Sequence, residues 1–226
     1  MRRVAPGVAA VVCVGLVVLT GCGNDAGAST APVGANQPAD AAAGAPAPAA
    51  VSGLAGLAVV PDGFLKGAPG EPSQETGPFT RQSFVDTLSA SPAEDLALLL
   101  NAGCKEGYQT FRSSQDRRKR VTVQLFKAAT AAKARDLQKG FWAQDEHTKP
   151  FVVPGVKGAL TDAQTGVIGV TGQIEAVAEA SITVGALVAE VTVSQSGTLE
   201  KTPVPDVKLA TTMLQLQYKR LTTKSG

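Results

Sequence analysis

The spacing of apolar residues predicts four helices in this chain. Apolar residues recur every three or four positions in four segments, so that each segment has one apolar face. These segments are residues 80–88, 92–102, 130–142 and 207–222. Ser91, Pro92 and Glu94 are typical of a helix start with a capping box, and Gly103 is typical of a helix end. Asp206 is expected to cap the last helix.

Alternation of apolar and polar residues predicts two β-hairpins and further short strands. The first hairpin joins residues 108–113 to 120–127 through the polar turn SQDRRK. The second joins residues 173–184 to 187–195 through a Gly-Ala turn. The runs KGALTDA and GVIGVTG are also expected to be short strands. Strands followed by a helix thus occur twice, after one or two amino-terminal helices, which indicates an α+β fold with an antiparallel sheet of about five strands packed by helices.

The amino terminus has the pattern of an export signal. Arg2 and Arg3 precede an apolar run over residues 8–19, which is shorter than the roughly 20 apolar residues of a membrane-spanning helix. The residues LTGC that follow, ending in Gly21 and Cys22, resemble the bacterial lipobox. The resemblance implies cleavage between Gly21 and Cys22, a diacylglycerol anchor on Cys22 and acylation of the new amino terminus, for example by palmitate. The alternative is an ordinary signal peptide with an incidental cysteine.

The next segment, residues 23–50, has the composition of a disordered linker. It is rich in Ala, Gly and Pro and contains no aromatic residue, Leu, Ile, Lys or Arg, so it cannot bury enough apolar surface to fold. We therefore divide the chain into four parts. These are a lipoprotein signal peptide over residues 1–21, a lipidated cysteine and tether over 22–53, a turn-rich lead-in over 54–79 and a single α+β domain over 80–222.

Charge and cysteine content exclude further classes of protein. The chain has 21 basic and 19 acidic residues, and loss of the two arginines of the signal leaves a formally neutral polypeptide. Neutrality argues against nucleic-acid binding, which needs a basic surface. Cys13 leaves with the signal and Cys22 carries lipid, so Cys104 cannot form an intramolecular disulfide. We expect Cys104 to be a small buried apolar group.

Residues for common catalytic chemistry are sparse. His147 is the sole histidine, which argues against catalytic zinc, and no G-x-S-x-G, P-loop or G-x-G-x-x-G motif separates a strand from a helix. Asp145, Glu146 and His147 could bind a divalent ion weakly, but a solvated loop after a helix is the simpler interpretation. We therefore expect no enzyme activity, no cofactor and no metal site.

Two further features are candidate contact sites. The first is a basic run, Arg117, Arg118, Lys119 and Arg120. It could contact anionic headgroups or wall polymers, and the alternative is a solvated hairpin tip. The second is the pair Phe141 and Trp142, which could line an apolar cleft. The alternative is that one of the two belongs to the core and the other covers a helix edge.

Three stretches carry a resemblance to a known group of proteins. They are KRVTVQLFKAATAAKARDLQKGFWA, VPGVKGAL and AVAEASITVGALVAEVTV. They resemble actinobacterial lipoproteins with PsbP-like or LpqN-type domains and the extracellular sensor domains of some actinobacterial kinases. The resemblance covers roughly residues 105–222. It implies a sheet-and-helix domain used for binding or sensing outside the membrane, and it carries no catalytic motif.

These observations support three hypotheses. The leading one is a lipid-anchored, non-catalytic binding, sensing or accessory module on the extracytoplasmic face of the cell membrane. Its partners would be the bilayer, through acylated Cys22, and an envelope protein or an apolar ligand, but not nucleic acid. The second is an envelope hydrolase that uses carboxylates alone, with Glu175 and Glu179 as the obvious pair. The third is a structural surface protein without a ligand.

Overall fold

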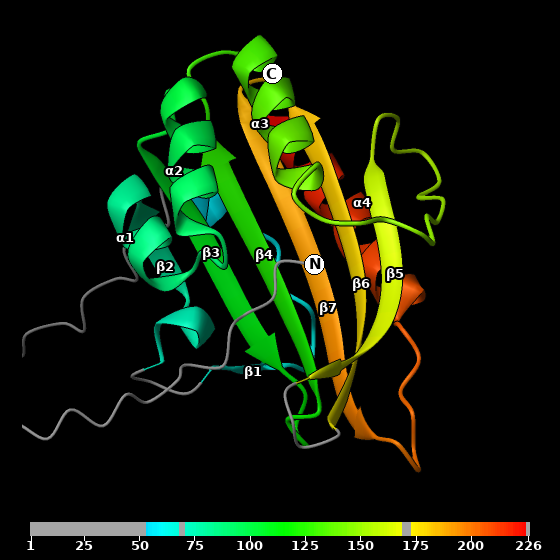
Figure 1. Ribbon diagram of the computed structural model, residues 1–226. Helices are drawn as coiled ribbons and strands as arrows, with labels where there is room; N and C mark the ends of the chain where they lie inside the picture. The colour runs from blue at the N-terminus through cyan, green and yellow to red at the C-terminus, as the bar shows by residue number, and fades with distance from the viewer. Residues whose placement is uncertain (1–52, 68–70, 169–172, 225–226) are drawn as a thin grey trace, which may run out of the picture. The chain divides into compact units, whose positions relative to one another are not determined.

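Seven strands form one antiparallel sheet in a computed structural model that describes residues 53–67, 71–168 and 173–224 (Figure 1). The strands are β1 (Leu65–Lys66), β2 (Gly77–Thr80), β3 (Glu106–Ser113), β4 (Lys119–Lys127), β5 (Leu160–Ile168), β6 (Gln173–Val184) and β7 (Leu187–Thr198). Their order across the sheet is β1-β3-β4-β7-β6-β5, and β2 also pairs with β3. The predicted signal peptide, Gly21, Cys22 and all of the tether except Gly53 lie outside the described residues.

Both predicted hairpins are confirmed. β3 pairs with β4, and β6 pairs with β7, each in antiparallel register. Gly185 turns the second hairpin with a φ of 56°, a left-handed conformation that glycine adopts without strain. The expectation of two separate strands in KGALTDA and GVIGVTG is wrong in the described part of the chain. Gln164 and Thr165, which join the two runs, continue the pairing with β6, so that β5 is one strand.

The sheet has more strands than the five expected. The two added strands, β1 and β2, come from residues 54–79, which the sequence pattern describes as a turn-rich lead-in. They have two and four residues, too few to show an alternating pattern. Their pairing with the longer β3 places them at the sheet edge, where Phe79 lies opposite Gly107. Contacts with a distant part of the chain therefore determine these strands.

Four α-helices in the described part of the chain accompany the sheet, as the apolar spacing predicts. They are α1 (Arg81–Thr87), α2 (Pro92–Asn101), α3 (Ala131–Trp142) and α4 (Val207–Lys224), and two short 3₁₀ turns, η1 (Gly53–Gly56) and η2 (Pro72–Gln74), precede them. The predicted capping box at Ser91 is wrong. Ser91 directly precedes α2, but its side chain makes no capping hydrogen bond within the described part of the chain. Instead Ser89 Oγ accepts from the Ser91 N–H at 3.1 Å and donates to Asp95 at 2.7 Å.

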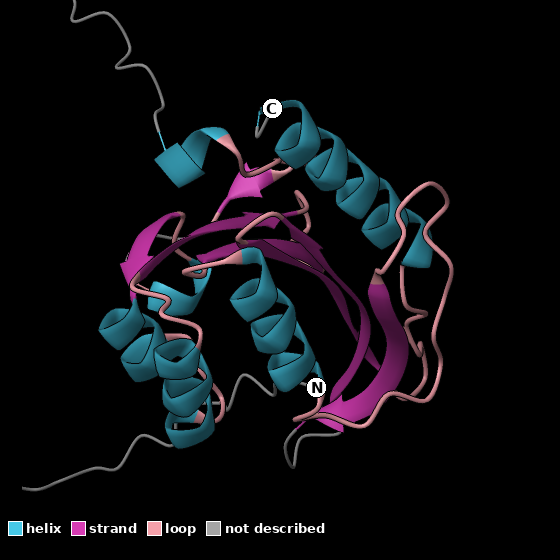
Figure 2. Cartoon of the chain, turned by 90° about the horizontal axis from the view of Figure 1, so that it is seen from above, coloured by secondary structure: helices cyan, strands magenta, loops and turns pink. Residues whose placement is uncertain are grey.

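The helices lie on opposite faces of the sheet (Figure 2). α4 packs on one face, and α1, α2 and α3 pack on the other. The core under α4 is aliphatic and includes Val121, Val123, Val191, Val193, Met213 and Leu214. The core under α1–α3 is built around four phenylalanines, Phe79, Phe84, Phe126 and Phe141. Ring centroids of Phe126 and Phe141 are 5.1 Å apart, in the edge-to-face geometry that aromatic pairs prefer.

Cys104 belongs to this second core. Its side chain is a free thiol, only 1 % exposed, next to the end of α2. Burial raises the pKa of the thiol, because the thiolate would lose its hydration. Cys104 is therefore the small buried group that the sequence predicts.

Candidate functional site

The sheet face under α3 is polar over much of its area. Residues that pair across antiparallel strands point to the same face, so the register gives rows of side chains across the sheet. The row next to the phenylalanine core is Gln109, Gln124, Glu190, Ser181 and Leu160; the next is Phe111, Thr122, Thr192, Glu179 and Asp162; the third is Ser113, Arg120, Ser194, Val177 and Gln164. In these rows only Phe111, Val177 and Leu160 are apolar. We call the three rows the polar face.

The polar face differs from the other side of the same strands. The alternate residues under α4, such as Val123 and Val191, are buried and apolar. Many side chains of the polar face are neither core nor fully exposed: Thr122, Gln124 and Thr192 are half-buried. In Figure 1, α3 lies over one end of β6 and β7, and among the described elements no helix is drawn over their other ends on this face. An antiparallel sheet can simply expose one face to water, but that face would then be more exposed than this one.

Two hydrogen-bonded groups order the side of the polar face that β3 and β4 form. Gln124 Nε2 donates to Gln109 Oε1 at 2.8 Å, and Gln109 Nε2 donates to the Glu75 carbonyl at 3.0 Å. Arg120 forms an ion pair with Glu175 and donates through Nε to Ser194 Oγ at 3.2 Å. These contacts hold the side chains in place within the domain itself.

The other side of the polar face carries three carboxyl groups. Asp162 on β5 lies directly opposite Glu179 on β6, and Glu190 on β7 lies directly opposite Ser181. Asp162 is only 1 % exposed. Its Oδ1 accepts from the Lys149 N–H at 2.7 Å. Three acidic side chains thus share two neighbouring rows of this face.

Four buried side-chain atoms have no hydrogen-bond partner within the described residues. They are Gln138 Nε2, His147 Nδ1, Asp162 Oδ2 and Ser181 Oγ. Ser181 and Asp162 belong to the polar face, and Gln138 lies on the buried side of α3, which packs on β6 and β7. Each such atom costs about 1–3 kcal/mol of folding free energy, so native proteins contain few of them. Two of the four, Asp162 Oδ2 and Ser181 Oγ, belong to adjacent rows of the polar face.

His147 lies at the rim of this region. Its Nε2 donates to the Trp142 carbonyl at 2.7 Å, because a carbonyl oxygen can only accept. Its Nδ1 lies 3.8 Å from Asp162 Oδ2.

The predicted aromatic pair is divided between two environments. Phe141 is 3 % exposed and packs against Phe84 and Phe126 in the core. Trp142 is half-buried and stacks on the His147 ring, with centroids 3.9 Å apart. The two side chains therefore face different neighbours.

The basic run at residues 117–120 also has two parts. Arg117 and Arg118 are exposed in the β3–β4 turn, where Arg117 has a φ of 57°. Lys119 Nζ contacts Asp206 Oδ2 at 2.5 Å, at the start of α4, and Arg120 pairs with Glu175. Two of the four cations thus have acidic partners within the domain.

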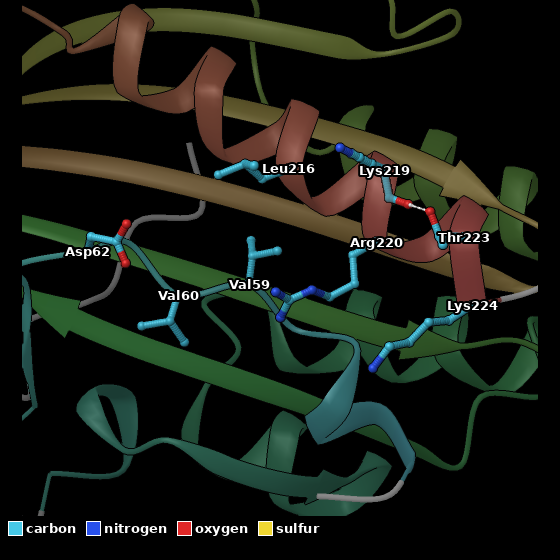
Figure 3. A pocket seen from close by; sticks show the side chains of 8 residues that line it. All are labelled: Val59, Val60, Asp62, Leu216, Lys219, Arg220, Thr223 and Lys224. Atoms are coloured by element: carbon cyan, nitrogen blue, oxygen red, sulfur yellow. Dashed lines mark hydrogen bonds between the residues drawn. The ribbon is translucent and has the colours of Figure 1, made fainter.

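An open pocket of about 450 Å³ lies at the surface, between residues 59–62 and the last turns of α4 (Figure 3). Its lining combines apolar side chains such as Leu216 with the basic Lys219, Arg220 and Lys224. Arg220 donates to the Ala58 carbonyl at 2.9 Å and Lys224 to the Gly56 carbonyl at 3.1 Å. These side chains hold the first described residues against α4, which gives them a structural role without a ligand.

The described residues contain no group of three His, Cys, Asp or Glu side chains placed to bind a metal ion. Asp145, Glu146 and His147 are thus not brought together as a metal site. Across the described ranges, no helix has the length and apolar character needed to cross a membrane.

Comparison with known proteins identifies no family for this chain. No family model matches it, and no curated protein matches it. Among solved structures it is similar to the extracellular domain of PknH from Mycobacterium tuberculosis, with 11 % sequence identity and a TM-score of 0.34. That likeness covers 56 % of this chain and 69 % of the other. A likeness of this size identifies neither family nor function.

Sequence reasoning missed most of the polar face. It singled out Glu175 and Glu179, but Glu175 is engaged by Arg120, and the residues opposite Glu179 are Asp162 and Thr192. A signal was present in β4 and β7, where the alternate positions Arg120, Thr122 and Gln124, and Glu190, Thr192 and Ser194, are all polar. Only the register, however, shows that these positions share one face.

Proposed function

We propose that this chain is an exported lipoprotein, held at the extracytoplasmic face of the membrane by acyl chains on Cys22, whose folded part is a non-catalytic binding module. The LTGC sequence and the linker composition support the anchor. The observation that carries the binding role is the polar face, with its half-buried hydroxyl, amide and carboxyl groups and its buried unpaired atoms. A polar ligand suits this surface better than the apolar ligand that the sequence analysis suggests.

Anchoring is tested by the substitution Cys22→Ser. The wild-type chain is expected to partition into the detergent phase in a phase-separation assay, and Cys22→Ser into the aqueous phase, because a hydroxyl does not accept the thioether-linked lipid. Cys13→Ser is the matched control, since Cys13 lies in the same segment and is expected to leave with the signal. Detergent partitioning of Cys22→Ser would contradict the anchor.

Binding is tested on the wild-type chain solubilised from membranes. Native mass spectrometry is expected to show a mass beyond the acylated polypeptide that is lost on denaturation, because a module that binds an envelope component retains some of it. If the spectra in several gentle detergents show only the mass of the acylated polypeptide, the structural protein without a ligand would be favoured.

A hydrolase that uses carboxylates alone is the alternative function that the acidic residues of the polar face support. Glu179 and Glu190 share this face, as an acid–base pair would have to. Asp162, however, is 1 % exposed, so a glycosidic bond cannot reach both it and Glu179. Release of soluble sugars from envelope glycans by the wild type, but not by Glu179→Gln, would establish the hydrolase in place of the binding module.

A further inference from the structure

The outer face of the last turns of α4 is both basic and apolar. The helix contains four basic residues and no acidic residue. Leu216, Lys219, Arg220 and Thr223 are spaced by three or four positions, so they lie on one side of the helix, and all four are exposed. Leu216 is 48 % exposed, and Val60, which lines the same pocket, is 42 % exposed. This surface therefore combines positive charge with apolar side chains that face water.

The bonds to the start of the described chain account for only part of this surface. Arg220 and Lys224 donate to backbone carbonyls, which are neutral and leave the two positive charges in place. Lys219 Nζ has no hydrogen bond or ion pair with any described residue. Asp62 is the one acidic residue of the lining and lies at the end of the pocket away from Lys224 (Figure 3). Three cations and one carboxylate give the lining a formal charge of +2.

The pocket adjoins the point at which the predicted tether joins the domain. Gly53 is the first described residue and begins η1, and Gly56 at the end of the same turn accepts from Lys224. Thirty residues lie between Cys22 and Gly53. As the disordered linker that their composition predicts, they would span about 30 Å on average. An anchor on Cys22 would thus hold the pocket near the bilayer at a millimolar effective concentration, at which a weak contact is populated.

We infer that this pocket docks the domain on the bilayer by binding the headgroup of an anionic phospholipid, with Lys219, Arg220 and Lys224 as the contacts of its phosphate. This inference rests on the lipoprotein proposed above and adds a second membrane contact to the acyl chains. Ammonium and guanidinium groups form charge-assisted hydrogen bonds with phosphate. Leu216 and Val60 would lie against the acyl boundary, as the apolar residues of interfacial helices do. Each basic residue near an anionic bilayer strengthens the partitioning about fivefold.

Other occupants fit this pocket less well. A second copy of the chain would bring a lining of the same positive sign to a two-fold interface, which is repulsive. A purely apolar ligand would remove water from the cations without offsetting their charge. A small soluble anion would offset the charge but would leave Leu216 and Val60 in water. A bilayer surface supplies the anion and the apolar boundary together.

Docking through this pocket would also orient the domain. The pocket lies beside α4, on one face of the sheet, and the polar face lies on the other (Figure 2). The α4 side would then rest on the bilayer, and the polar face would be open to the extracytoplasmic space. A module that binds a ligand there would be held in a favourable orientation.

The test is lysine footprinting of the wild-type chain, solubilised from membranes and placed in lipid nanodiscs. An acetylating reagent modifies exposed amines, and mass spectrometry gives the rate at each lysine. One disc contains phosphatidylcholine alone, and the other contains phosphatidylcholine with phosphatidylglycerol. We expect acetylation of Lys219 and Lys224 to be about threefold or more slower in the anionic disc, and the difference to shrink as salt rises from about 20 to 300 mM. Lys139, exposed on α3 across the sheet, is the internal control and should react equally in both discs.

A charge reversal locates the contact. In Lys219→Glu the slowing at Lys224 is expected to be lost, because the lining then has two cations and two carboxylates. Lys208→Glu makes the same change at an exposed position in the first turn of the same helix, outside the pocket, and should keep the wild-type slowing. A melting temperature within a few degrees of the wild type checks that each variant is folded.

Four results would overturn the inference. They are equal rates at Lys219 in the two discs, wild-type slowing at Lys224 in Lys219→Glu, an equal loss of slowing in Lys208→Glu, and a loss in Arg117→Glu alone, which would place the headgroup contact at the β3–β4 turn. Soluble glycerol phosphate and a capped tetraglutamate peptide are added to the neutral disc as further probes. Full slowing by either would assign the pocket to a soluble anion or to an acidic protein segment, and not to the bilayer.

Docking and anchoring can fail separately. Equal rates in the two discs would remove the headgroup contact and leave the anchor, which Cys22→Ser tests by phase separation. Detergent partitioning of Cys22→Ser, together with slowed acetylation of Lys219 in the anionic disc, would remove the acyl anchor and leave the headgroup contact.

Discussion

Asp206, the residue that starts α4, shows how one side chain can stabilise both a helix and a sheet. Its Oδ1 accepts from the Leu209 N–H at 2.9 Å, and its Oδ2 contacts Lys119 Nζ on β4 at 2.5 Å. Burial acts to raise the pKa of Asp206, but the hydrogen bonds from Lys119 and Leu209 and the positive charge of Lys119 outweigh it. The pKa is therefore below its ordinary value.

Two substitutions separate these roles. Asp206→Ala is expected to lower the free energy of unfolding by about 1–2 kcal/mol at pH 7, because it removes both the cap and the ion pair. Asp206→Asn keeps a capping oxygen and should lose less. Since the pKa is lowered in the folded state, the stabilisation is present above the pKa of the unfolded chain and is lost as the pH falls below about 4.

Urea denaturation at pH 7 and pH 3 measures both effects. The difference between the wild type and Asp206→Asn should shrink at pH 3, because the carboxyl group is then largely protonated in the unfolded chain and folding has to release that proton. Equal losses for the Asn and Ala variants would show that the ion pair, and not the cap, provides the stabilisation.

At the scale of single elements, β2 depends on the absence of a side chain on its partner. Gly107 on β3 lies opposite Phe79, whose ring packs over it in the phenylalanine core. A Cβ at position 107 would come within 2.2 Å of that ring and 2.5 Å of the Leu125 carbonyl oxygen. The short strand is thus held by a close approach of a ring to a backbone.

Gly107→Ala is expected to destabilise the domain by about 3 kcal/mol, because the ring or the strand has to move. Gly77→Ala is the matched control on β2. A Cβ there would meet nothing within 4 Å, so the expected change is small. Thermal unfolding of the two variants checks this, and similar melting temperatures would contradict the packing described.

The elements that could be predicted from sequence are the long ones. α1 to α4 and both hairpins have enough residues for a period to be visible, and their limits agree closely with the pattern. β1 and β2 have no period of their own.

The polar face was only partly predictable for a similar reason. Glu179 and its neighbours are visible as polar alternates within one strand, but Asp162 and Glu190 join them only through pairing across three strands.

At the scale of the whole described domain, the end of α4 is hydrogen-bonded to residues near the start of the described chain. Gln217 is fully buried; its Oε1 accepts from the Val59 N–H and its Nε2 donates to the Leu57 carbonyl, both at 2.9 Å. Arg220 and Lys224 add bonds to the carbonyls of Ala58 and Gly56. Residues 56–59 are thus held along two turns of the helix.

Gln217→Leu is expected to cost about 2 kcal/mol, because it leaves a backbone N–H and a carbonyl buried without partners. Hydrogen exchange should speed up first at residues 56–60. Gln215→Leu, which removes an exposed bond to the Pro154 carbonyl, is the matched control and should change stability by less than about 0.5 kcal/mol. Unchanged exchange at residues 56–60 in Gln217→Leu would contradict this role.

This fastening has a mechanical consequence. The contact between Lys224 and Gly56 places both ends of the described chain at one corner, beside the helix on the opposite side of the sheet from the carboxyl cluster. In the lipoprotein proposed above, tension from the anchor would reach the domain at that corner. The strands that carry Glu179 and Glu190 lie on the other side of the sheet from that corner, so the proposed binding surface would be little distorted by such a force.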